Sequence, residues 1–293
     1  MNYCSPQEIS SNSLQTWRTK TSLSLGGMVS LGILAGAYIA LGAVGATMVT
    51  HDIAAVGLAR LLTGAVFAVG LMMVIIAGGE LFTGNILITI GVLEGSVRVR
   101  SMLRNWLVVY FANFAGSLLV AYLMYASGLW SYNNNQVGAA VLKVAAAKTG
   151  LTFGMALARG ILCNWLVCVA VWMAFAGKDV VSKIFGIFFP IMLFVSSNFE
   201  HSIANMYYIP AGILAKNMPA VVEASHLGTK LDSLNWHNFL FANLLPVTMG
   251  NIVGAGLFVA FFYWFAYLRD RAPQPIPAAS PSHLARSVAA AGD

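Results

Sequence analysis

Ionisable and amide side chains interrupt an otherwise apolar run between residues 184 and 214. Glu200, His201 and Asn205 lie together near the middle of this run. Such groups are costly at membrane depth, so they usually line a cavity or a path instead of facing lipid. Two interpretations follow: a satisfied polar cluster that holds helices together, or a site through which a small solute passes.

A second interruption, at residues 78–85, resembles the first. Both contain the pattern Glu-x4-Asn, as Glu80 with Asn85 and as Glu200 with Asn205. Further matches follow in the same order: Gly32-Ile33-Leu34 with Gly160-Ile161-Leu162, and Asn113-x-x-Gly116 with Asn251-x-x-Gly254. We interpret them as two three-span halves, which an odd number of spans forces into opposite orientations. Paired interruptions in an inverted repeat point to a transport site.

A helix that breaks within a membrane leaves backbone N–H and C=O groups without intrahelical partners. Such a break is tolerated only where protein or a water-filled cavity surrounds it. We expect Glu80 and Glu200 to accept hydrogen bonds from the orphan N–H groups, with Asn85 and Asn205 supporting the breaks. The half-helix N-termini suit an anion.

Composition indicates an integral membrane protein. Of 293 residues, 59% are hydrophobic and only 9% are charged, against about a quarter in soluble domains. Mean hydropathy is +0.77. The net charge of +6 forms no basic stripe with interleaved aromatics, so we expect no nucleic-acid partner. The three cysteines have neither disulfide nor metal-site spacing, and nothing indicates a cofactor.

The apolar runs predict an all-α protein with six transmembrane helices. A span needs about 20 apolar residues, and such runs occur at about 25–49, 61–92, 106–128, 151–176, 184–215 and 239–267. The second and fifth runs are the interrupted ones, and we expect both helices to break.

We divide the chain into three parts. An interfacial N-terminal helix is expected at 1–22, a six-span pore domain at 23–270 with repeats at about 23–128 and 151–268, and a disordered Pro- and Ala-rich tail at 271–293. Ten of the sixteen Lys and Arg residues fall on the side of the termini, which predicts that both termini are cytoplasmic.

Four segments carry a family resemblance: Gly79-Glu80-Leu81-Phe82-Thr83-Gly84-Asn85, Phe199-Glu200-His201-Ser202-Ile203-Ala204-Asn205-Met206, Gly160-Ile161-Leu162-Cys163-Asn164-Trp165-Leu166-Val167-Cys168 and Pro246-Val247-Thr248-x-Gly250-Asn251-Ile252. Together they resemble the formate/nitrite transporter family over about residues 15–270. The segments 245–251 and 263–269 look more like the formate branch, whereas 163–168 also looks like the nitrite branch.

The resemblance implies an aquaporin-like protomer in the cell's inner (cytoplasmic) membrane, assembled as a homopentamer with one pore in each protomer. The substrate would be a small monovalent anion such as formate, nitrite or hydrosulfide, with a proton. It also assigns roles to residues. The central histidine falls on His201, the mobile-loop threonine on Thr83, the vestibule base on Lys148 and the amide beneath the histidine on Asn164; Asn251 is pore-proximal. The apolar constrictions correspond to Phe67, Leu71, Leu81, Phe82 and Phe194, with Val167 beside them.

We expect formate transport that depends on pH through His201, because imidazole, with an unperturbed pKa of about 6.5, suits proton exchange near neutral pH. The anion either takes a proton and crosses as the neutral acid, or crosses beside an imidazolium. Two other classes remain as alternatives. A water or neutral-solute channel usually has Asn-Pro-Ala half-helix caps, which this sequence lacks. An electron-transfer subunit or membrane enzyme would need haem ligands or a catalytic constellation, yet only His201 lies deep in a span.

Overall fold

The computed structural model describes residues 3–270, and within them the chain is helical with no β-strand. The first half begins with α2 (Leu25–Thr50), which crosses the membrane unbroken. Next come α3 (Val56–Met72) and its π-helical continuation η1 (Met73–Gly78). After a break, the second span resumes as α4 (Phe82–Asn85) and α5 (Ile88–Leu93), and α6 (Val99–Ala126) forms the third span.

The second half repeats this order. An unbroken α8 (Phe153–Ala176) is followed by α9 (Val180–Ser196), a break and α10 (Ser202–Ala215). The sixth span runs through η4 (Asn238–Leu244), α12 (Leu245–Ala255), η5 (Gly256–Phe261) and α13 (Phe262–Tyr267). The predicted six-span inverted repeat is confirmed, and so are the breaks in the second and fifth spans.

Helices in equivalent positions pack in equivalent ways. In the first half α2 packs against α6 and α3, and in the second half α8 packs against α12 and α9. Glycines allow the closest of these contacts, because a Cβ on Gly116 would collide with the carbonyl oxygen of Ile33, and one on Gly254 with that of Ile161. Small residues let membrane helices approach at the backbone. The paired Asn-x-x-Gly patterns therefore mark the two tightest helix pairs.

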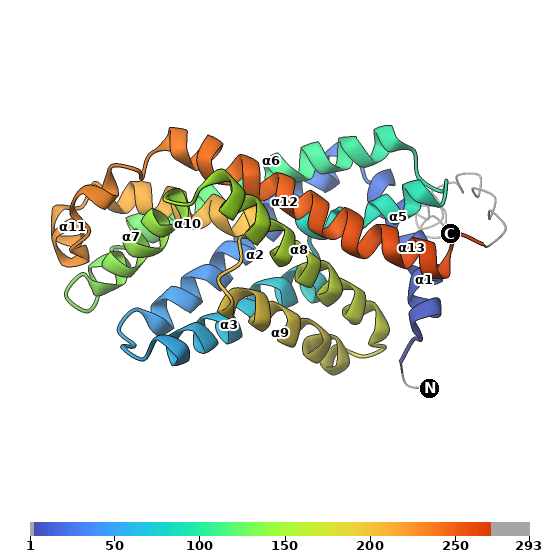
Figure 1. Cartoon of the computed structure of the whole chain (residues 1–293), viewed down its shortest axis with the longest axis horizontal. Helices are drawn as coiled ribbons and strands as arrows, with labels where there is room; N and C mark the ends of the chain where they lie inside the picture. Colours follow the sequence, from blue (N-terminus) through green and yellow to red (C-terminus); the bar gives the residue numbers. More distant parts are fainter. Residues whose placement is uncertain (1–2, 271–293) are drawn as a thin grey trace, which may run out of the picture.

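The helices outside the repeat cover the two ends of the molecule. One end carries α1 (Pro6–Ser22), which packs near α13, and the opposite end carries α7 (Gln136–Thr149) and α11 (Pro219–Ser225), as Figure 1 shows. Short 3-10 turns, η2 (Leu129–Ser131) and η3 (Gly228–Leu231), complete that opposite end.

Two of these helices bear on the predictions. A helix was expected within residues 1–22, and α1 is one; its position at the membrane surface stays a prediction. It begins with a capping box in which the backbone N–H of Ser5 donates to the Glu8 carboxylate, and this lowers the pKa of that carboxyl. By contrast, α7 was not expected. The predicted disordered tail at 271–293 lies outside the described residues.

Candidate functional site

Both broken spans turn through a residue with positive φ. Gly78 has φ +93° in the first break, and Asn198, at the equivalent position, has φ +59° in the second. Glycine and asparagine are the residues that adopt this conformation most readily. Two residues later, each break is hydrogen-bonded to the first span of its own half. The N–H of Glu80 donates to the Leu31 carbonyl of α2 (3.1 Å), and that of Glu200 donates to the Arg159 carbonyl of α8 (3.2 Å).

Two buried asparagines hold the restarted helices. Asn113 Oδ1 accepts the first N–H of α4, from Phe82 (2.9 Å), while Nδ2 donates to the Gly32 and Glu80 carbonyls (2.7 and 2.8 Å). In the other half, Asn251 Oδ1 accepts the first N–H of α10, from Ser202 (2.9 Å). Its Nδ2 donates to the carbonyls of Gly160 and Glu200 (2.8 and 3.0 Å). Each amide thus binds both ends of a break to a neighbouring helix.

The carboxylates have partners other than those expected. We anticipated backbone N–H donors for Glu80 and Glu200, but Asn113 and Asn251 already accept the first N–H of each restarted helix. Each carboxylate instead belongs to a quartet of side chains, with a lysine and two asparagines. The quartets are Lys20, Glu80, Asn85 and Asn105 in the first half, and Lys148, Glu200, Asn205 and Asn243 in the second.

The two quartets share four contacts, and the second adds two more to Glu200 Oε2, from Lys148 Nζ (3.1 Å) and from Asn243 Nδ2 (3.4 Å). Lysine Nζ meets glutamate Oε1 at 2.7 Å in the first and 3.0 Å in the second. The break asparagine donates to glutamate Oε2 (2.7 and 2.6 Å) and to the second asparagine (2.8 and 2.7 Å). That second asparagine donates in turn to the lysine carbonyl (3.2 and 3.0 Å). Removal of one partner would leave a buried charge unpaired. Each quartet therefore stabilises its break through the ion pair between lysine and glutamate.

Lys148 therefore carries a paired charge. The resemblance implied a vestibule base at this position, and the side chain does line a cavity together with His201. However, its ammonium contacts both Glu200 oxygens (3.0 and 3.1 Å) and lies 5.4 Å from the centroid of the Tyr208 ring. Its field at the cavity is partly cancelled by the carboxylate.

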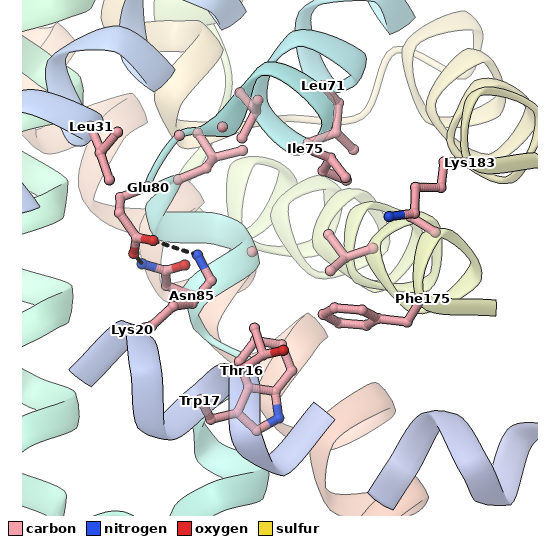
Figure 2. A pocket seen from close by; sticks show the side chains of 17 residues that line it. Thr16, Trp17, Lys20, Leu31, Leu71, Ile75, Glu80, Asn85, Phe175 and Lys183 are labelled. Atoms are coloured by element: carbon pink, nitrogen blue, oxygen red, sulfur yellow. Dashed lines mark hydrogen bonds and ion pairs between the residues drawn. The ribbon is translucent and has the colours of Figure 1, made fainter. Parts of the chain in front are cut away.

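Two cavities approach the breaks from opposite ends. The larger, of about 360 Å³, opens beside α1 and reaches Glu80 and Leu81. Figure 2 shows Glu80, Asn85 and Lys20 joined on one wall, with the Lys183 side chain extending toward the cavity from the other. The smaller, of about 100 Å³, lies beside α7 and reaches His201 and Phe194.

Buried apolar side chains lie between the cavities. Leu71 and Leu81 face the larger cavity, whereas Phe67 and Phe194 face the smaller one and pack edge to face, with ring centroids 5.9 Å apart. All the side chains predicted as constrictions are buried, namely Phe67, Leu71, Leu81, Phe82, Val167 and Phe194. Their assignment to the constrictions stays a prediction.

Thr83 and His201 meet at this neck. Their Oγ1 and Nε2 atoms are 2.9 Å apart, and both side chains are buried. Asn164 Nδ2 donates to the backbone carbonyls of Thr83 (3.2 Å) and Asn251 (2.9 Å), so it connects the two halves beneath the contact. The structure thus brings together Thr83, His201, Asn164 and the backbone of Asn251.

The hydrogen bonds of His201 indicate its tautomer. Nδ1 accepts the N–H of Ala204 (3.1 Å), so it carries no proton. A neutral imidazole with a bare Nδ1 has its proton on Nε2, which then donates to Thr83 Oγ1. This conformation holds a neutral imidazole, and a second proton would displace the Ala204 contact.

Some residues of the site were not predicted from the sequence. Lys20, Asn105 and Asn243 complete the quartets, and Lys183 faces the larger cavity. A signal for the asparagines was present: Asn105 precedes Asn113 by eight residues, as Asn243 precedes Asn251. The lysines had been counted only for topology.

Two inverted halves, each with a broken span, around a neck between opposed cavities define a multi-pass membrane protein of the channel and transporter class. The family model for the formate/nitrite transporter matches residues 7–265. This chain belongs to that family.

Relatives and solved structures agree. The chain is 41% identical over 269 residues to a probable formate transporter of Methanothermobacter thermautotrophicus, covering 86% of this chain and 92% of that protein. It is 41% identical over 217 residues to the formate channel FocA of Escherichia coli K12, covering 73% and 76%. A structure described as a pentameric formate channel with formate bound matches with TM-score 0.75 and 37% identity, covering 84% of this chain and 98% of that one.

Proposed function

We propose that this protein is a channel, not an enzyme, that conducts formate through a pore in each protomer of a homopentamer in the cytoplasmic membrane. The observation that carries the proposal is the contact between Thr83 and His201, which lies at the neck between two opposed cavities. Relatives named as formate transporters and channels, and a pentameric formate channel of similar fold, support the substrate and the assembly.

Passage requires Thr83 and Phe82 to withdraw. Both lie in α4, which has only four residues. Its first residue is hydrogen-bonded to Asn113, and its last residue, Asn85, belongs to the first quartet. So short a helix is not stable by itself, and α4 is the element suited to move. Its displacement would free the Nε2 atom of His201 toward the neck.

A proton accompanies the anion in this proposal. A bare carboxylate is costly among the Phe and Leu side chains of the neck. When the Ala204 contact opens, His201 takes a proton from the cavity side and becomes an imidazolium. It then donates the Nε2 proton to the formate oxygen, giving formic acid and a neutral imidazole whose proton is on Nδ1. Release of that proton to water and uptake of one at Nε2 restores the resting tautomer with no net change of charge. The neutral acid crosses the apolar neck.

Flux measurements test the substrate. Purified protein in liposomes should carry formate faster than nitrite, lactate and hydrosulfide, compared side by side across pH, with protein-free liposomes as control. Nitrite or hydrosulfide flux faster than formate flux would reassign the substrate within the family. Water flux without anion flux, or a coloured redox-active preparation, would contradict the proposal itself.

Substitution of His201 by Asn tests the proton linkage. Asparagine cannot titrate, and its Oδ1 lies at about the position of the histidine Nδ1, so it can still accept the Ala204 N–H. Wild-type formate flux should rise as the pH falls, because protonation of His201 supplies the proton that formate takes, and the His201→Asn channel should lose this rise beyond what the acid–base equilibrium of formate itself supplies. An unchanged pH profile in correctly assembled His201→Asn protein would remove His201 from the proton path.

A further inference from the structure

An apolar groove runs along the outer surface between α6 and α12, which lie side by side (Figure 1). Its volume is about 450 Å³. The rim consists of exposed α6 side chains, Leu103, Leu107 and Phe111, which are 52%, 62% and 60% exposed, facing Leu245 and Thr248 of α12. The floor is Phe82.

The floor residue connects the groove to the restarted helix. Phe82 is a predicted constriction residue and the first residue of α4. Its ring lies 4.8 Å from that of Tyr110 and 6.1 Å from that of Trp106. Tyr110 is bonded to Thr248 across the groove (2.9 Å), and Trp106 Nε1 donates to the Asn85 carbonyl at the end of α4 (2.9 Å). A molecule that fills the groove therefore contacts Phe82 of α4 from the side facing the outer surface.

One end of the groove is basic. A second hollow continues it past Leu107 and is lined by Arg100, Ser101 and Arg104. Both arginines are exposed, and neither has an ion pair within residues 3–270. Arg104 reaches only the Leu23 carbonyl, at 3.4 Å. Two guanidinium groups that have no carboxylate partner here can bind a phosphate through several N–H donors.

The spacing fits a lipid. Residues 100, 104, 107 and 111 follow each other at intervals of four and three, so they lie on one face of α6. From Arg100 to Phe111 the helix rises about 16 Å, which matches one leaflet of a hydrocarbon core about 30 Å thick. A headgroup at the arginines would place its acyl chain along Leu107 and Phe111.

We propose that this groove is a binding site for an anionic glycerophospholipid. Its phosphate binds Arg100, Arg104 and the Ser101 hydroxyl, and one acyl chain lies in the groove against Phe82. The bound chain limits the space into which Phe82 can withdraw. This site is separate from the anion path, and its occupancy does not depend on which anion the pore carries.

Lipid retention measures the site directly. Detergent-purified protein is incubated with phosphatidylglycerol or with phosphatidylcholine of the same acyl chains, and the bound lipid is counted by native mass spectrometry. Phosphatidylglycerol should bind about tenfold to thirtyfold more tightly, since each basic side chain adds a few-fold to the affinity for an anionic lipid. Inorganic phosphate at equal concentration should not displace it, because the acyl chain supplies the remaining affinity.

Matched variants locate the site. Arg100→Gln with Arg104→Gln should abolish the preference for phosphatidylglycerol, whereas Arg98→Gln, an exposed arginine of the same helix end outside both hollows, should retain it. Leu107→Trp fills the groove and should weaken the binding of both lipids; Leu119→Trp, at an exposed α6 position outside the groove, is its control.

Three outcomes overturn the proposal. Equal binding of the two lipids would remove the basic headgroup site, and full displacement by phosphate would reduce it to an anion site. Disulfide-linked dimers of Leu107→Cys protein in lipid vesicles would show that a second copy of the chain occupies the groove.

Discussion

At the residue scale, the lysines of the two cavities fall into two kinds. Lys20 and Lys148 are neutralised by buried glutamates and belong to the framework. Lys183, at the wall of the larger cavity, has no ion pair among residues 3–270. A charge without a counter-charge in a concave site raises the local anion concentration. We therefore propose that Lys183 attracts anions to the larger cavity, while the role expected of Lys148 at the smaller cavity stays a prediction.

Lys183→Gln should reduce anion flux from the α1 side about threefold to tenfold at low ionic strength, with little effect at high salt, where the field is screened. Lys183→Arg keeps the charge and should preserve flux. Lys178→Gln alters a neighbouring lysine outside the cavity and serves as the control. The measurement is initial formate flux into vesicles across a salt series. A loss of flux that is independent of salt would assign Lys183 a packing role instead.

At the element scale, the breaks depend on Asn113 and Asn251. Replacement of Asn251 by Leu removes three buried hydrogen bonds, and at about 0.6 to 1.7 kcal/mol for each bond within a membrane the protein should lose about 2 to 5 kcal/mol. Asn113→Leu should cost a similar amount, because its three bonds are equivalent. Thermal unfolding of the purified protein measures both.

A control and a second variant sharpen this test. Asn217→Leu, at an exposed position beyond α10, should change stability by less than about 0.5 kcal/mol. Asn251→Asp can still accept the Ser202 N–H, but it turns a buried carboxyl toward two carbonyl oxygens, so it should be at least as destabilising as Asn251→Leu. If Asn251→Leu unfolds at the wild-type temperature, the buried amides do not hold the breaks.

The same elements show how far the sequence leads. The breaks were predictable because Glu-x4-Asn recurs in two long apolar runs, and such polar groups are costly at membrane depth unless they have partners. The hydrogen-bond partners at the breaks were not predictable, because the first N–H of each restarted helix donates to a side chain 31 or 49 residues away. Helix α7 was not predicted, because its Ala-rich sequence is too short and too weakly apolar to indicate a transmembrane span. The π-helical turns of the sixth span leave no mark in the hydrophobic pattern.

At the scale of the whole molecule, the two halves share a framework but differ at the neck. The position occupied by Leu81 in the first break is occupied by His201 in the second. The titratable group therefore meets the neck from the second half alone, while the first half contributes the apolar Leu81 and the hydroxyl of Thr83. In the proposed mechanism His201 is the proton site between two unlike entrances, so the orientation of the chain in the membrane decides which compartment supplies the proton.

That orientation can be measured with the native cysteines. Cys163 and Cys168 are buried and should not react, whereas Cys4 is partly exposed and lies two residues before α1. With both termini cytoplasmic, a membrane-impermeant maleimide should leave Cys4 unlabelled in intact cells and label it in inverted vesicles. Lys230→Cys, at an exposed site in η3 near the α7 end, should show the reverse pattern. Labelling of Cys4 from outside intact cells would invert the topology and place the larger cavity, with Lys183, on the external face.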